Sequence, residues 1–327
     1  KVTGVQTCAL PISLLGFASC ISLSSHEERS FLSWMRDSNQ FFTGNDYQFR
    51  LGVYLSNQRR VQEHNQGTSS FKVAMNKLAA YTEAEYKTLL GHIQTSKVGY
   101  ANGKKATKQD VDAWDWREKG IVNPVKDQGQ CGSCWTFSVV QAMESKYAQV
   151  KGELLSLSEQ NLVDCVTTCY GCNGGDEYIA YDYILQHQDG YWMLETDYPY
   201  KGVDGTCKFD KTKGVAKFTS YYRPTTTQDE TQLANAVASD GVVSIAIDAS
   251  HWSFQMYSSG IYDEKRCSSY ALDHAVGLVG FGSENGKNYW IVRNSWGPSW
   301  GENGYIRMIK DKNNQCGVAS DTIIPKI

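Results

Sequence analysis

The stretch "DQGQCGSCWTFS", residues 127–138, carries two cysteines three positions apart, Cys131 and Cys134. This spacing is compatible with a redox couple, with half of a zinc site, or with one structural cysteine beside one reactive cysteine. Apolar side chains follow at helical spacing, at Phe137, Val140, Met143 and Tyr147. We therefore expect a helix that begins at Ser133–Cys134 and carries the second sulfur at its N-terminus.

A second C-x-x-C, Cys169 and Cys172, could supply the rest of a zinc site. The two pairs are separated by 34 residues, whereas zinc sites of this type usually have roughly 15–20. A thioredoxin-like couple needs a strand before the first cysteine, and only the short "GIVNPV" (120–125) precedes it. We therefore expect no metal and no cofactor. Metal analysis and a reversible dithiol titration would reveal either alternative.

A reactive cysteine needs a base, a group that orients the base, and an oxyanion donor. Gln128 lies six residues before Cys134, His274 lies in "LDHAVG" (272–277), and Asn294 lies in "RNSWG" (293–297). A helix N-terminus and a nearby imidazolium both lower the pKa of a thiol. We therefore expect a thiolate at Cys134 that attacks an acyl carbon, with His274 protonating the leaving amine.

The three motifs "QGQCGSCW", "LDHAVG" and "RNSWG" together resemble the papain family of cysteine peptidases. The resemblance covers residues 27–327. It implies Cys134 as the nucleophile, His274 as the base, Asn294 as the orienting amide, Gln128 as the oxyanion donor, and Trp296 as the indole that shields the His–Asn bond. It further implies an α+β fold of two halves, one helical and one resembling a β-barrel, with the active-site cleft between them.

The chain before this body is expected to form helices at 27–42 and 45–66. Six residues of the second helix share one face, namely Asp46, Arg50, Tyr54, Asn57, Val61 and Asn65. They resemble the E-R-F-N-I-N pattern of cathepsin L-type proregions. The second proregion pattern, G-x-N-x-F-x-D, is degraded to Ala74, Asn76, Leu78 and Ala80. The resemblance implies an inhibitory propeptide that crosses the cleft in a non-productive direction.

Four segments are expected along the chain. Residues 1–12 look like translated sequencing adapter and are interpreted as non-native, and residues 13–25 resemble the end of a signal peptide. Residues 26–109 are expected to be the propeptide and residues 110–327 the peptidase domain. The polar segment 95–110 is the expected cleavage region, and the mature enzyme is expected to begin near Asp110.

The body divides by texture into a helical part and a β-rich part. Helices are expected at 134–147 and at 157–165. For the second helix Ser156 and Glu159 form a good capping pair, and Ser158 and Asn161 form a weak one. Later segments rich in β-branched and aromatic residues predict strands, at 242–249, 274–282, 288–296 and 304–311.

Charge is unevenly distributed between these parts. Residues 1–109 hold 13 basic and 7 acidic side chains, and residues 110–327 hold 19 and 28. We interpret this as attraction between propeptide and body rather than nucleic-acid binding, and acid protonation of the body would weaken that attraction. Apolar runs long enough to span a membrane are missing, so no membrane association is expected, and the default oligomeric state is a monomer.

The chain has ten cysteines, a density that suggests disulfides and a secretory route, to a lysosome, a digestive vacuole or the exterior. Spacing alone cannot decide their connectivity. Family similarity implies the pairs Cys131–Cys172, Cys165–Cys207 and Cys267–Cys316, with Cys134 free. Cys169 is left over, either as an inert thiol or as a competitor for pairing with Cys165 or Cys172. It also implies inhibition by cystatin-type proteins.

In this family one subsite, which reads the second residue before the scissile bond, dominates substrate choice. By motif, the residues expected to line this subsite or to bind substrate beside the catalytic groups are Gly175, Asp176, Glu177, Ala246, Leu272, Asp273, Trp296 and Asp321. Glu177 and Asp321 could bind a basic side chain while Ala246 and Leu272 contact its aliphatic stem. Alternatively both carboxylates turn to solvent and Leu or Phe is preferred.

The expected function is that of a cysteine endopeptidase zymogen that hydrolyses protein and peptide substrates through a thioester. An inactive papain-like binding protein is the main rival, and failure of a thiol-directed epoxide to label Cys134 would favour it. Peptide ligation on the same site is a further alternative, because an amine can replace water at the thioester.

Overall fold

The computed structural model describes residues 25–94, 111–225 and 227–327. The interpretations of residues 1–12 as adapter-derived and of 13–25 as a signal-peptide remnant concern a segment that lies outside these residues, apart from Ser25. The cleavage region 95–110 and the mature N-terminus near Asp110 also lie outside them. Within the described residues, none of the helices is long and apolar enough to cross a membrane.

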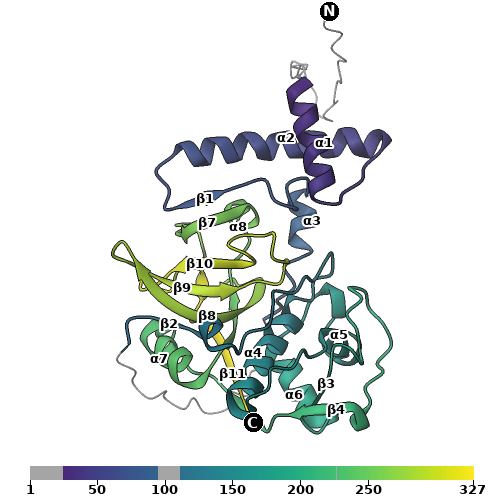
Figure 1. The fold of residues 1–327 in the computed structure, drawn as a ribbon, viewed down its shortest axis with the longest axis vertical. Coiled ribbons are helices and arrows are strands. Elements are labelled where there is room, and N and C mark those ends of the chain that lie inside the picture. Colours follow the sequence, from purple (N-terminus) through teal and green to yellow (C-terminus); the bar gives the residue numbers. More distant parts are fainter. Residues whose placement is uncertain (1–24, 95–110, 226) are drawn as a thin grey trace, which may run out of the picture.

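The propeptide folds as a small helical unit above the body (Figure 1). It contains α1 (Ser25–Asp37), α2 (Gly44–Gln66), β1 (Phe71–Val73) and α3 (Glu83–Lys87). The first helix ends five residues before the predicted Phe42, because Asn39 adopts a left-handed conformation (φ 51°) that breaks the helix. Phe31 and Trp34 of α1 pack on Tyr54 of α2, with ring centroids 5.2 and 5.4 Å apart.

The six-residue face of α2 holds the propeptide together more than it binds the body. Tyr54, Asn57 and Val61 are buried, and the Asn57 amide donates to the Ala79 carbonyl at 2.9 Å. On the body side, the indole N–H of Trp252 donates to Asn57 Oδ1 at 2.9 Å. At the other end of the face, the Asn65 amide donates to the Val73 carbonyl at 2.7 Å and accepts from the Val73 N–H at 3.1 Å. This face therefore fixes the backbone at Val73 and Ala79, and Asn57 links it to the body.

Arg50 finds a carboxylate partner outside the degraded second pattern. Its guanidinium binds both carboxylate oxygens of Glu85, at 2.6 and 2.5 Å, and donates to the Ala80 carbonyl at 2.9 Å. Glu85 also accepts from the Thr82 N–H at 2.8 Å in the capping box that starts α3. Thus a carboxylate five residues beyond Ala80 joins α2 to α3.

The helical half of the body is built around α4 (Cys134–Lys151), which is buried along most of its length. It also contains α5 (Glu159–Cys165), α6 (Glu177–His187) and the hairpin of β3 (Tyr191–Met193) and β4 (Gly214–Lys217). The preferred capping pair of α5, Ser156 and Glu159, is wrong by two residues, and the weaker alternative at Ser158 is confirmed. Ser158 caps the helix by accepting from the Asn161 N–H at 3.0 Å, because the helix begins only at Glu159.

The β half is one mixed sheet with α7 (Glu230–Asp240) and α8 (Trp252–Gln255) beside it (Figure 1). The strand order is β1-β7-β10-β9-β8-β6-β11-β5, and β2 pairs with β8. The body strands are β2 (Trp114–Asp115), β5 (Ser220–Tyr222), β6 (Val243–Ile247), β7 (Tyr257–Tyr262), β8 (His274–Glu284), β9 (Lys287–Arg293), β10 (Tyr305–Ile309) and β11 (Asp321–Lys326). Short 3-10 helices lie at Trp116–Lys119, Gly171–Asn173, Lys211–Lys213 and Gln315–Gly317.

The propeptide extends this sheet with its own strand. β1 pairs antiparallel with β7, with Phe71 opposite Gly260 and Lys72 opposite Ser259. The Ser70 hydroxyl adds a bond to the Ile261 carbonyl at 2.7 Å. Backbone pairing of this kind depends little on side-chain identity, so the strand supplies affinity while other contacts supply specificity.

Disulfides and a buried ion-pair cluster stabilise the two halves of the body. The disulfides Cys131–Cys172, Cys165–Cys207 and Cys267–Cys316 are present, and Cys134 and Cys169 are free and buried. Lys126 binds the buried carboxylates of Glu144 on α4 and Glu159 on α5, at 3.0 and 2.8 Å. A single cation thereby ties the two helices beneath the loop that leads to Cys134.

Candidate active site

Cys134 is the first residue of α4 and is completely buried. The disulfide between Cys131 and Cys172 fixes the turn that precedes Cys134, and the Gly132 N–H donates to the Cys172 carbonyl at 2.8 Å. The sulfur of Cys134 accepts from the Ala275 N–H at 3.5 Å. Since Ala275 is the second residue of β8, the sulfur lies where the helical half meets the β half.

His274 and Asn294 come together from the adjacent strands β8 and β9. His274 is the first residue of β8, Asn294 follows the end of β9, and His274 Nε2 lies 2.8 Å from Asn294 Oδ1. The same oxygen accepts from the Ser295 N–H at 2.8 Å, which fixes the orientation of the amide. Because Oδ1 can only accept, Nε2 carries the proton and a neutral ring has its free lone pair on Nδ1.

Trp296 covers the imidazole. The two ring centroids lie 4.8 Å apart, and Trp296 itself is 1% exposed. Phe254 packs against both rings, with its ring centroid 6.2 Å from that of His274 and 5.7 Å from that of Trp296. The hydrogen bond between His274 and Asn294 is therefore screened from water.

Gln128 lies in the loop that precedes Cys134 and is buried. Its side-chain oxygen accepts from the Ser295 hydroxyl at 2.7 Å, and its amide nitrogen donates to the Cys131 carbonyl at 2.9 Å. The same nitrogen donates to the Leu89 carbonyl of the propeptide, also at 2.9 Å. A carbonyl oxygen thus occupies the place to which this amide can donate.

The propeptide lies between the two halves at this point. The Gly91 N–H donates to the Cys134 sulfur at 3.2 Å, and the Gly91 carbonyl accepts from Gly175 at 2.9 Å. The His92 N–H donates to the Asp273 carbonyl at 3.1 Å, and His92 pairs with Gly175 in the parallel sense. This segment therefore contacts both walls of the site and the sulfur itself.

The residues that surround this segment include the predicted pocket. Glu177 contacts the propeptide directly, with Oε2 2.9 Å from Nδ1 of His92. Ala246, Leu272 and Asp321 are all buried, and Asp321 pairs with Ala246 across β11 and β6. Glu177 does not turn to solvent in this structure, since its side chain is only 3% exposed.

Two of the predicted pocket residues have additional local roles. The Asp176 carboxylate caps α6 by accepting from the Tyr178 N–H at 2.8 Å. The Asp273 carboxylate accepts from the Ala249 N–H at 2.8 Å, while its backbone carbonyl holds His92. One oxygen of each carboxylate is thus committed to the fold.

The electrostatics of the pair differ from the prediction of an activated thiolate. Burial raises the pKa of Cys134 to about 12, and burial lowers the pKa of His274 to about 4. The predicted lowering of the Cys134 pKa is therefore wrong for this form of the protein. The propeptide excludes water from both groups, and desolvation disfavours a thiolate as much as an imidazolium.

The reasoning from sequence missed the propeptide residues that touch the site, Leu89, Gly91 and His92. They lie between α3 and the described end of the propeptide, where hydrophobic periodicity is weak. The adjacent Gly91 and His92 are the only features of this segment that could have drawn attention, but neither residue type by itself indicates a contact in the cleft. Only the fold brings them to Cys134 and Glu177, residues 43 and 85 positions away.

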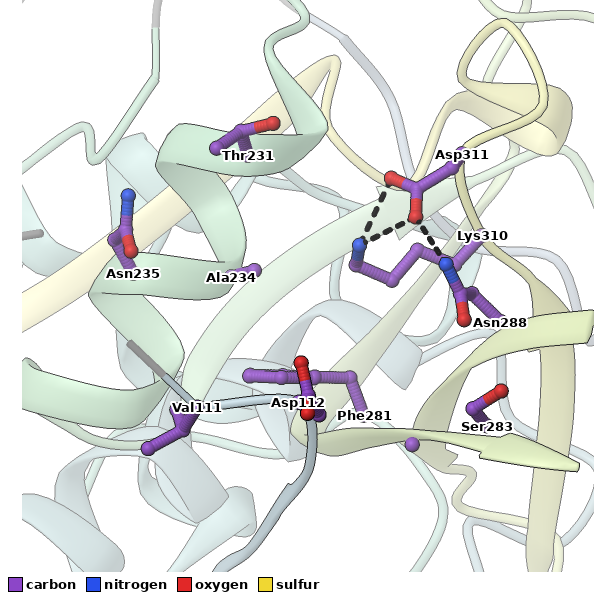
Figure 2. Close-up of a pocket in the computed structure, with 11 residues that line it drawn as sticks. Val111, Asp112, Thr231, Ala234, Asn235, Phe281, Ser283, Asn288, Lys310 and Asp311 are labelled. Carbon is purple, nitrogen blue, oxygen red and sulfur yellow. Dashed lines mark hydrogen bonds and ion pairs between the residues drawn. The ribbon is translucent and has the colours of Figure 1, made fainter. Parts of the chain in front are cut away.

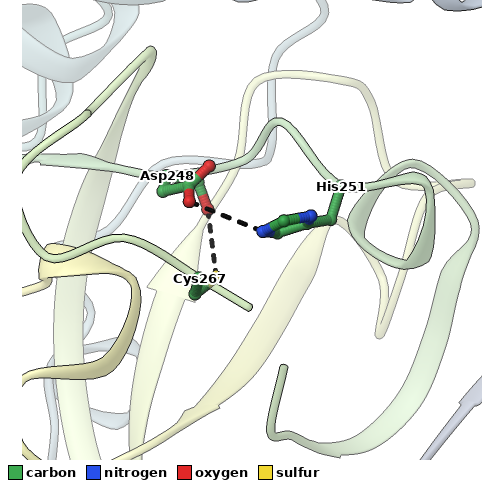
Figure 3. Close-up of side chains that lie close together, drawn as sticks. All are labelled: Asp248, His251 and Cys267. Carbon is green, nitrogen blue, oxygen red and sulfur yellow. Dashed lines mark hydrogen bonds and ion pairs between the residues drawn. The ribbon is translucent and has the colours of Figure 1, made fainter. Parts of the chain in front are cut away.

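Two other features of the described residues lie apart from this site. Asp248, His251 and Cys267 lie close together (Figure 3), but the Cys267 sulfur is bonded to Cys316 and offers no thiolate to a metal. A cavity of about 620 Å³ lies beside α7, where Asp311 binds Lys310 and Asn288 (Figure 2). None of the predicted site residues lines that cavity.

Comparisons with known proteins agree with this geometry. A family model described as papain family cysteine protease matches residues 111–326, and one described as cathepsin propeptide inhibitor domain matches residues 31–86. The chain belongs to the papain family of cysteine proteases. It is a hydrolase with its propeptide attached, a zymogen of cathepsin L-like type.

Individual relatives place the chain within this family. Cathepsin L2 of Homo sapiens is 39% identical over 96% of this chain and 97% of the relative. Cathepsin L of Sarcophaga peregrina is 43% identical over 85% and 86%. The solved digestive procathepsin L 3 of Tenebrio molitor larval midgut superposes with a TM-score of 0.85 at 34% identity, covering 93% of this chain and 100% of that one. The papain-like procathepsin fold is thus confirmed.

Proposed function

We propose that Cys134 is the nucleophile of a cysteine endopeptidase and that His274, Asn294 and Gln128 complete its catalytic machinery. One observation carries the proposal. The Cys134 sulfur, at the N-terminus of α4, accepts a hydrogen bond from the backbone of β8 next to His274, which is itself hydrogen-bonded to Asn294. The free lone pair of Nδ1 can accept the thiol proton, and the Asn294 bond keeps the ring in the tautomer that allows it.

The bonds made and broken follow from these positions. The thiolate attacks the peptide carbonyl carbon, and the resulting oxyanion accepts hydrogen bonds from the Cys134 N–H and the Gln128 amide. The imidazolium then protonates the leaving amine as the C–N bond breaks, which leaves a thioester. Water, deprotonated by the neutral imidazole, hydrolyses the thioester and regenerates the thiol.

The attached propeptide opposes this chemistry in two ways. Leu89 fills the acceptor position at Gln128, and Gly91 covers the sulfur, so a substrate carbonyl has no access. The same burial keeps the thiol and the imidazole neutral. Removal of the propeptide rehydrates both groups, and the thiolate–imidazolium pair becomes favourable at the helix N-terminus.

The test is incubation of the purified zymogen in acid, with mass and hydrolysis of a Phe-Arg reporter amide followed together. Cys134→Ala is the matched control. We expect a mature species that begins near residue 110 and turns over the reporter, and neither change in the control. A correctly folded, trimmed body with no turnover and no labelling by a thiol-directed epoxide would overturn the proposal in favour of a binding protein.

We further propose that the specificity pocket accepts a basic side chain at the second position before the scissile bond. The propeptide already inserts an ionisable nitrogenous side chain, His92, against Glu177, with Asp321 nearby. Ala246 and Leu272 can contact the aliphatic stem of an arginine while the carboxylates bind its head.

Peptide amides that differ only at this position, Arg against Leu, test the specificity. We expect comparable kcat/KM values for the two in the parent enzyme. Glu177→Gln and Asp321→Ala should each lower the Arg value selectively, about tenfold or more for the loss of one charge-assisted contact, and leave Leu nearly unchanged. Equal losses for both peptides would show that these carboxylates do not select substrate.

The remaining expectations concern the setting of the enzyme. We infer that it follows the secretory route to a lysosome, a digestive vacuole or the exterior, because three disulfides require an oxidising compartment. It is expected to act as a monomer and to be inhibited by cystatin-type proteins. Sedimentation of the mature enzyme and titration with a cystatin test these two points.

A further inference from the structure

His92 is a buried ionisable side chain at the contact between the propeptide and α6. Its side chain has no exposed surface, and Nδ1 lies 2.9 and 3.2 Å from the two oxygens of Glu177. The backbone is pinned on both sides, since the His92 N–H binds Asp273 and the Ile93 N–H binds the Gly175 carbonyl at 2.8 Å. The imidazole therefore cannot leave the pocket unless this segment of the propeptide detaches.

The surroundings of the imidazole are acidic. Glu177 lies in the first turn of α6, and the carboxylates of Asp176, Asp273 and Asp321 act on the same ring from the start of α6, the approach to β8 and the start of β11. The Arg223 cation offsets part of the charge of Asp321, and His274 at the start of β8 is a further basic group that interacts electrostatically with His92. A neutral, apolar plug would leave Glu177 buried without a cationic partner, which is costly.

We propose that His92 is a charge-dependent plug of this acidic pocket, which holds the propeptide across the active site while its imidazole is protonated and holds it less tightly when the imidazole is neutral. This inference rests on the proposed function of the pocket as a binding site for basic side chains. It extends that proposal from substrate choice to the regulation of the zymogen.

The direction of the pH dependence follows from the protonation states. Burial alone lowers the pKa of His92, but the charge and hydrogen bond of Glu177 outweigh it and raise the pKa to about 9 from 6.5. Its contribution to docking is therefore complete below pH 6.5 and is lost as the pH rises through about 9.

Glu177 does not reverse this direction. Burial raises its pKa to about 7, while the charge and the hydrogen bond of His92 lower it, so the imidazolium faces an ionised Glu177 above about pH 7. Once Glu177 is protonated, the imidazolium still faces Asp321, Asp176 and Asp273. Protonation of His92 thus strengthens this contact as the pH falls from about 9 to 7, whereas protonation of Glu177 below pH 7 removes part of the attraction.

The experiment measures opening of the intact zymogen by alkylation of Cys134 with iodoacetamide between pH 6 and 9.5. A His274→Ala background prevents self-processing, and peptide mapping separates Cys134 from Cys169, the other free cysteine among the described residues. At each pH the rate for His92 is divided by that for His92→Leu, because the thiolate fraction of the open form cancels in the ratio. His92→Gln serves as a second neutral variant should the leucine variant fold poorly.

We expect the ratio to rise by on the order of 100-fold between pH 6.5 and 9.5, since docking raises the pKa of His92 from 6.5 to about 9. Glu177→Gln should flatten the rise. A ratio that stays constant with pH for both neutral variants would overturn the inference. Turnover of the Arg and Leu peptide amides by the mature enzyme, which lacks His92, tests the peptidase and its pocket separately, so failure of one proposal is distinguishable from failure of the other.

Discussion

Gly91 is the propeptide residue whose replacement should open the zymogen most directly. A Cβ atom at this position would lie 1.8 Å from the Gly132 carbonyl oxygen and 2.5 Å from its carbon. Gly132 cannot retreat, because its N–H is bonded to Cys172 and the adjacent Cys131 is held by a disulfide. In Gly91→Ala the propeptide must therefore move away from Cys134.

The size of the effect can be worked out from these contacts. Overpacking of a tight contact costs about 1–3 kcal/mol, and loss of the bond between Gly91 and Gly175 adds about 0.5–1.5 kcal/mol. The docked state of this segment should thus be weakened by about 1.5–4.5 kcal/mol. At about 1.4 kcal/mol for each factor of ten, opening increases roughly 10- to 1,600-fold.

Alkylation of Cys134 by iodoacetamide in the His274→Ala zymogen measures this opening at a single pH. Gly52→Ala is the matched control, because Gly52 lies in α2 with no atom within 4 Å of the added methyl group. We expect strong acceleration for Gly91→Ala and the parent rate for Gly52→Ala. A parent-like rate for Gly91→Ala would contradict this prediction, since it would mean that this segment does not cover the sulfur as closely as the structure shows.

Three further outcomes are expected. Lys126→Met should lower the free energy of unfolding, measured by denaturant titration, by about 3–5 kcal/mol, because the buried carboxylates of Glu144 and Glu159 lose their shared cation. Arg50 holds the pKa of Glu85 at about 2, below its usual 4.5. This contact therefore stabilises the propeptide above pH 4.5 and is lost as the pH falls toward 2. In hydrogen exchange of the propeptide, Glu85→Gln should remove this part of the acid dependence. Gly175→Ala would place a Cβ 2.7 Å from the Trp135 ring, so the mature enzyme should show a raised KM for peptide amides in steady-state kinetics and a lowered Tm.

Local patterns in the sequence determined much of the fold. The helix that starts at Cys134 and the strands β6, β8, β9 and β10 were predicted within a few residues, because each has a strong hydrophobic period of its own. The cap of α5 and the end of α1 were not, since alternative capping residues lie close together and one left-handed asparagine decides the end.

The motifs around Cys134, His274 and Asn294 determined the family, because these residue types at these spacings serve one chemistry. Their state of charge could not be predicted from the motifs. Whether a thiol ionises depends on how much water reaches it, and here that is set by a propeptide segment 43 residues earlier in the chain.

Partnerships between distant residues were decided only by the tertiary structure. Arg50 binds Glu85 and His92 binds Glu177, pairs that lie 35 and 85 positions apart, and neither pair follows a local period. Hydrophobic periodicity reports which face of an element is buried, but it carries no information about which charged groups meet across a folded interface. The choice of partner for a buried charge is therefore made by the packing of the whole chain, and in this protein that choice determines how the propeptide holds its enzyme.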